Sequence, residues 1–71
     1  MTKNEFLSIL NQRGIDRSMI RWEDSADDDV FCVFPQNGAW WVYYQERGKH
    51  FREMTFPTES DALDYLMTRL L

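Results

Sequence analysis

The chain is poor in the side chains that most enzymes use for chemistry. Among its 71 residues there is one cysteine, Cys32, and one histidine, His50. A single cysteine cannot form an internal disulfide, and this pair alone cannot complete a zinc site. Glycine is also scarce, with three residues, and none of them belongs to a glycine-rich phosphate loop. We therefore expect no metal, no cofactor and no enzymatic activity.

Long hydrophobic runs are lacking as well. No stretch approaches the roughly 18 apolar residues that a membrane span needs. The N-terminus has neither the basic start nor the apolar run of about 7–15 residues that a signal peptide needs. We expect a soluble, cytoplasmic protein that makes no contact with a membrane.

Positive charge is scarce and scattered, with 8 lysines and arginines against 12 acidic residues and a net charge of -4. A nucleic-acid binder needs concentrated positive charge, so we expect no nucleic-acid partner. The acidic residues are clustered instead, because residues 23–29 hold five carboxylates. This segment lacks the central glycine and terminal glutamate of a calcium loop. It is either a solvated loop or a contact surface for a basic protein.

Aromatic residues are abundant, and most of them lie in residues 31–56, a segment that contains two turn signals. Asn37-Gly38 is typical of a two-residue hairpin turn, because both residues tolerate a positive φ. Residues 46–48 resemble a three-residue loop with Gly48 in the left-handed position of a bulge. The segment therefore predicts three antiparallel strands, over residues 31–35, 39–45 and 49–56.

The two turns also predict the register, and hence which side chains share a face. The first turn pairs Val33 with Val42, and the second pairs Gln45 with Lys49. Cys32 and His50 then lie on opposite faces, so we expect no catalytic Cys–His pair and interpret them as a small apolar residue and an exposed strand residue. One predicted face carries Phe31, Val33, Trp40, Val42, Tyr44, His50, Arg52, Met54 and Phe56, and the other carries Cys32, Phe34, Trp41, Tyr43, Phe51, Glu53 and Thr55.

Two helices and a further strand complete the predicted fold. Thr2 and Glu5 have the spacing of a capping box, and Gly14 fits a left-handed C-terminal cap, which predicts a helix over residues 3–13. A second helix begins at Thr58 or Ser60 and runs to the chain end, and residues 19–22 form an edge strand. We predict a single α+β domain over residues 1–71, with a four-stranded antiparallel meander flanked on one face by an N-terminal and a C-terminal helix.

Two helices can cover only one face of such a sheet. We expect the face of Val42 to be buried, the alternative being that Trp41 and Tyr43 form the core while Trp40 and Tyr44 are exposed. An exposed aromatic patch of this size marks an interface, unless it is a homodimer seam or is partly covered by the termini. The predicted patch contains Phe34, Trp41, Tyr43 and Phe51.

The segment WWVYYQERG at residues 40–48, followed by Phe56, Glu59, Ala62, Tyr65 and Leu66, resembles small immunity proteins of bacterial polymorphic toxin systems, of the contact-dependent inhibition and Rhs type. In those proteins a W-x-V-Y-Y-x-E-R-G strand and turn precedes an F-x-x-E-x-x-A-x-x-Y-L helix, and Cys32-Val33 also fits the pattern. The chain departs from it at Gln45, where a small polar residue is usual, and in its longer acidic loop.

The resemblance implies a cytoplasmic protein that binds one cognate toxin domain and blocks it without catalysis. Many such toxins present a basic cleft, which acidic residues could occupy while speeding association. The alternative is a structural or regulatory module that self-associates through the aromatic face, and alone we expect a monomer or weak homodimer. The expected partner-binding residues are Trp41 and Tyr43 as the anchor, with Phe34, and Glu23, Asp24, Asp27, Asp28, Asp29 and Glu46 as an acidic rim.

Overall fold

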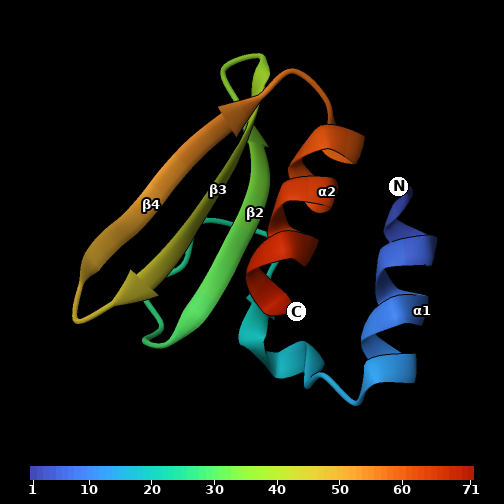
Figure 1. The fold of residues 1–71 in the computed structure, drawn as a ribbon. Helices are drawn as coiled ribbons and strands as arrows, with labels where there is room; N and C mark the ends of the chain where they lie inside the picture. The colour runs from blue at the N-terminus through green and yellow to red at the C-terminus, as the bar shows by residue number, and fades with distance from the viewer.

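The computed structural model describes residues 1–71 and shows a four-stranded sheet with a helix from each end of the chain (Figure 1). The α+β fold class, the bounds of the first helix and those of the last strand are confirmed. Neither helix is long and apolar enough to cross a lipid bilayer. The elements are α1 (Lys3–Arg13), a 3-10 turn η1 (Arg17–Met19), β1 (Ile20–Arg21), β2 (Val30–Gln36), β3 (Ala39–Glu46), β4 (Lys49–Phe56) and α2 (Glu59–Leu70).

Local capping interactions begin and end α1 where the sequence predicts. The backbone N–H of Glu5 donates to Thr2 Oγ1, and the backbone N–H of Thr2 donates to Glu5 Oε1, both at 3.1 Å. Gly14 ends the helix with a φ of 68°. At the start of α2, the Thr58 hydroxyl accepts a hydrogen bond from the backbone N–H of Asp61, which identifies Thr58 as the N-cap.

The first hairpin has the predicted register. Asn37 and Gly38 have φ angles of 52° and 77°, and Val33 pairs with Val42. The second hairpin differs, because Arg47 and Gly48, with φ angles of 52° and 73°, form a two-residue turn. Glu46, and not Gln45, therefore pairs with Lys49.

This slip of one residue moves the first half of β4 to the opposite faces. His50 pairs with Gln45 and so shares a face with Cys32, while Phe51 pairs with Tyr44. The predictions for His50 and Phe51 are wrong, as is the prediction that Cys32 and His50 lie on opposite faces. A bulge between the pairs at Tyr44 and Val42 then adds one residue to β4, which returns Met54 and Phe56 to their predicted face.

The sheet is mixed, and the prediction of a purely antiparallel meander is wrong. β1 is an edge strand, as expected, but it pairs parallel to β2 through Ile20 and Phe31. The chain therefore leaves β1 in the direction of β2 and must return to the start of β2. Residues 22–29 make this return behind β2 and β3, on the side of the sheet away from the helices (Figure 1).

The helices cover the face of the sheet that carries Val33, Val42 and Tyr44, which we call the helix-side face. In Figure 1, α2 lies along this face and α1 packs beside α2. The expectation that the Val42 face is buried is confirmed. The core between the helices and the sheet consists of Phe6, Leu10, Ile20, Val33, Val42, Ala62, Leu63, Leu66 and Met67.

Candidate binding surface

The opposite face, which we call the loop-side face, carries a second small core in place of the expected exposed patch. Phe34 and Tyr43 are 8% and 2% exposed, and Cys32 is fully buried. The expectation that Phe34 and Tyr43 are exposed is therefore wrong. Phe51 is 44% exposed, but it lies on the helix-side face. The cover is supplied by residues 23–29, which we call the acidic loop.

Two phenols of β3, one on each face of the sheet, bind aspartates at the two ends of the acidic loop. The hydroxyl of Tyr43 donates a hydrogen bond to Asp24, and the hydroxyl of Tyr44 donates to Asp29 Oδ1 at 3.1 Å. The backbone N–H of Asp29 also donates to the carbonyl of Gln45, at 2.7 Å. The loop crosses the sheet because its carboxylates find donors there, so a run of acidic residues serves as a cover for apolar side chains.

Two further contacts fix the remainder of the loop. The guanidinium of Arg21 donates to Asp27 at 3.0 Å, and this hydrogen bond holds the pKa of Asp27 below its usual value. The backbone N–H of Arg47, in the second turn, donates to Asp28 Oδ1 at 2.9 Å. All the carboxylate residues of the loop are nevertheless exposed. The loop is thus ordered while its charges face water.

Trp41 is the aromatic side chain of the loop-side face that remains half exposed. Its ring N–H donates to the carbonyl of Gln36 at 3.1 Å, which fixes the indole beside the first turn. Trp41 borders a hollow of about 210 Å³. Four predicted site residues meet in this hollow, whose lining is Asp24, Phe34, Gln36, Trp41, Tyr43, His50 and Glu53.

Gln36, His50 and Glu53 complete this hollow and are not among the predicted site residues, although Glu53 is predicted on the correct face. The imidazole stacks on the ring of Tyr43, with centroids 3.8 Å apart and planes at 12°. Its Nδ1 lies 3.4 Å from Glu53 Oε2. The signal that could have found His50 is the length of the second turn, since a two-residue turn places it beside Tyr43.

Cys32 belongs to the small core of the loop-side face and is a poor nucleophile. It is fully buried, and this burial raises the pKa of its thiol. No three His, Cys, Asp or Glu side chains of the chain are grouped so that they could hold a metal ion. In the hollow itself, Trp41 is accompanied by the carboxylates of Asp24 and Glu53.

The phenols of Tyr43 and Tyr44 predict a loss of stability in alkali. Burial is the main cause that raises the pKa of both Tyr43 and Tyr44, and hydrogen bonds to Asp24 and Asp29 add to it. The folded state therefore keeps its phenolic protons more tightly than the unfolded state, whose tyrosines ionise near pH 10. The contribution of these two phenols to the free energy of unfolding is therefore fully present below about pH 10 and is lost as the pH rises above it.

Urea midpoints measured from about pH 8 to about pH 11 check this expectation. The Tyr43→Phe variant has one titrating phenol fewer, so its midpoint should fall less steeply above pH 10 than that of the unmodified chain. Parallel curves for the two proteins would contradict the role of Tyr43.

Scans against protein-family models, curated proteins and solved structures found no match. The resemblance to immunity proteins therefore stays a prediction from the motif, and the function has to be argued from the residues of this chain.

Proposed function

We propose that the chain is an immunity-type inhibitor, which binds a toxin domain of basic surface through the acidic loop and Trp41. The observation that carries the proposal is a half-exposed indole, fixed by a hydrogen bond, beside a loop whose five carboxylates all face solvent. Tryptophan is enriched among the residues that dominate protein–protein affinity. Clustered carboxylates attract a basic partner and speed its association.

The acidic loop is already held in one conformation, so binding a partner should cost it little conformational entropy. Asp24, Asp27, Asp28 and Asp29 each accept a hydrogen bond from within the chain. A carboxylate has two oxygens and can accept further donors, so these groups remain available to lysine or arginine side chains. A surface that is ordered before association loses less conformational freedom on binding.

The burial of Tyr43 and Phe34 changes the composition of the proposed anchor. Tyr43 is held beneath the acidic loop by its hydrogen bond to Asp24, and Phe34 packs edge-on against Tyr43 and beside Trp41, so both support the surface from below. Trp41 is then the single aromatic anchor, with Glu23 and Glu46 extending the acidic rim. This arrangement has an apolar contact at one end, beside Asp24, and charged residues that continue from it toward the second turn. Interfaces likewise combine an apolar hot spot with polar surroundings.

Co-expression tests the proposed function directly. We would express the chain together with the product of the gene immediately upstream of it, and ask whether a stoichiometric complex survives gel filtration. Immunity also requires that the chain protect cells from that domain. Failure to form a complex, together with a concentration-dependent mass of the chain alone, would favour self-association.

Replacing Trp41 with alanine tests the anchor. We expect binding to weaken by about 2 kcal/mol, or about 30-fold, if Trp41 is a hot spot. Met54→Ala is the matched control, because Met54 is an exposed apolar residue on the helix-side face. Isothermal titration calorimetry of the purified pair gives both affinities. Equal affinities for the two variants would contradict the anchor role.

Self-association is the second candidate function, and the exposed edge strand β4 favours it. Seven of the eight residues of β4 are exposed, with Phe51 and Met54 among them. An edge strand presents unpaired backbone groups that a second copy can bind. Lys49, Arg52 and the bulge oppose such pairing, because charge and irregular backbone are the features that protect strand edges. For this reason we place it second.

A further inference from the structure

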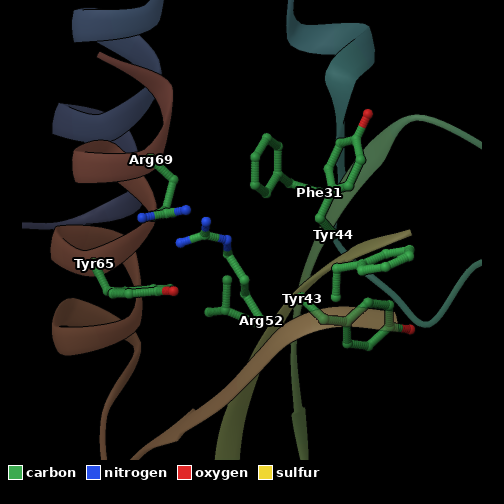
Figure 2. A pocket seen from close by; sticks show the side chains of 8 residues that line it. Phe31, Tyr43, Tyr44, Arg52, Tyr65 and Arg69 are labelled. Carbon is green, nitrogen blue, oxygen red and sulfur yellow. The ribbon is translucent and has the colours of Figure 1, made fainter. Parts of the chain in front are cut away.

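A second cavity, of about 210 Å³, lies on the other side of the sheet from the acidic loop. It opens between α2 and the strands, and Figure 2 shows its side chains converging from the helix and from the sheet. We call it the arginine pocket. Its lining consists of Phe31, Val42, Tyr43, Tyr44, Phe51, Arg52, Tyr65 and Arg69.

Two arginines reach this pocket from different elements. Arg69 belongs to the last turn of α2, and Arg52 lies at the bulge of β4. Figure 2 shows the two guanidinium groups directed into the same space, next to Tyr65. Neither arginine forms an ion pair, because the ion pairs of the chain join other residues. Two positive charges that share a pocket without a counter-ion repel each other, and a bound anion relieves that repulsion.

The backbone of β4 is distorted where Arg52 enters the pocket. Arg52 has a φ of 55°, a left-handed conformation that is costly for any residue with a side chain. Bulges commonly redirect a side chain, and here Arg52 lines the pocket on the helix-side face while Glu53 lines the hollow on the loop-side face. Successive side chains of a strand point to opposite faces, so Glu53 reaches His50 on the loop side at 3.4 Å, while Arg52 remains on the helix side without an ion pair.

We propose that the arginine pocket binds a carboxylate attached to an apolar or aromatic group the size of one amino-acid side chain. The planar guanidinium groups of Arg52 and Arg69 match a carboxylate, which accepts paired N–H donors. The aromatic walls formed by Phe31, Tyr44 and Tyr65 take the apolar body. The volume is below the roughly 300–1,000 Å³ of pockets for drug-sized ligands, so a dinucleotide is too large. A free organic acid and the C-terminal residue of a peptide share this chemistry.

The proposal is tested with N-acetyl-L-phenylalanine and its uncharged amide, N-acetyl-L-phenylalaninamide, titrated into the full chain and followed by amide NMR shifts. We expect the acid to shift residues around the pocket and the amide to bind at least about tenfold more weakly, since a hydrogen bond to a charged group is lost. Equal binding of acid and amide, or no binding of either, would overturn the proposal.

Arg52→Gln and Arg69→Gln should each weaken binding of the acid by about tenfold or more. Arg13→Gln is the control, because Arg13 is an exposed arginine in the last turn of α1. The two pocket positions are also exposed, and Arg69 lies outside the bulge, so its substitution leaves the strained backbone untouched. An equal loss in Arg13→Gln would overturn the assignment, because general charge would then explain the binding.

A short peptide that ends in phenylalanine with a free carboxylate distinguishes the two possible ligands, a free organic acid and the C-terminal residue of a peptide. Binding of this peptide as tight as that of the free acid supports a chain terminus as the ligand, whereas binding of the free acid alone supports a small molecule. The pocket opens on the helix-side face, and Arg52 and Arg69 belong neither to the acidic loop nor to the hollow of Trp41. These results are therefore independent of whether the chain inhibits a toxin.

Discussion

Replacing Tyr43 by alanine is expected to lower the free energy of unfolding by about 3–5 kcal/mol, the usual cost of removing a large aromatic side chain from a core. Tyr43 is 2% exposed, packs edge-on against Phe34 with ring centroids 5.8 Å apart, and stacks on His50. Its hydroxyl also binds Asp24. A domain of this length has about 4–10 kcal/mol of stability in all, so the variant should be largely unfolded under mild denaturing conditions. Urea denaturation followed by circular dichroism measures the loss.

Two variants separate the contributions to this effect. Tyr43→Phe keeps the packing and removes the hydrogen bond to Asp24. Because the Asp24 carboxylate can return to water, the free energy of unfolding should fall by only about 1 kcal/mol. Phe51→Ala removes an exposed aromatic residue from the adjacent strand, and we expect it to lower the free energy of unfolding by less than about 1 kcal/mol. If Tyr43→Ala cost no more than Phe51→Ala, the acidic loop would not cover a core.

The parts of the fold that the sequence predicts correctly depend on short-range chemistry. The capping box at Thr2 and Glu5 and the cap at Gly14 fix both ends of α1 within a few residues of chain. The Asn37-Gly38 turn fixes the register of β2 and β3 in the same way, since both residues accept the positive φ that the turn requires. Each of these signals is complete within the segment that it organises.

The second turn shows where a local signal is ambiguous. Gly48 accepts a left-handed conformation in a two-residue turn as well as in a three-residue loop, so the choice depends on Arg47. Arg47 has a φ of 52°, which is uncommon for a non-glycine residue and was therefore not expected. Its backbone N–H donates to Asp28, a partner that is distant in sequence. The faces of His50 and Phe51 follow from that contact.

The direction of β1 and the path of the acidic loop lie beyond local signals altogether. A strand of two residues has too little periodicity to indicate its orientation, and a short connection between neighbouring strands usually joins antiparallel partners. Charged residues also favour a solvated loop. The cover over Tyr43 is held by the hydrogen bond between its phenol and Asp24 and by that of the Asp29 amide to Gln45. These contacts are visible only once the parallel β1 sends the chain back across the sheet. The burial of Phe34 could not be predicted for the same reason.

The second large effect is expected for Phe6→Ala, which should also cost about 3–5 kcal/mol. Phe6 is fully buried and packs edge-on against Trp22, with ring centroids 5.9 Å apart. A helix as short as α1 is marginal in isolation and depends on such packing. Ser8→Ala, at an exposed position of the same helix, is the control and should change stability little.

The effect of Phe6→Ala should extend to the acidic loop, because Trp22 connects the two regions. Trp22 packs against Phe6 on the helix side, and Asp24, two residues later, binds Tyr43 on the other face. Loss of Phe6 removes the support of Trp22 and frees the start of the loop. Hydrogen exchange at the Asp29 amide, which donates to Gln45, should therefore accelerate more than exchange in the β2–β3 hairpin. Equal acceleration at both places would mean that the variant unfolds only globally, and that α1 does not hold the loop in place.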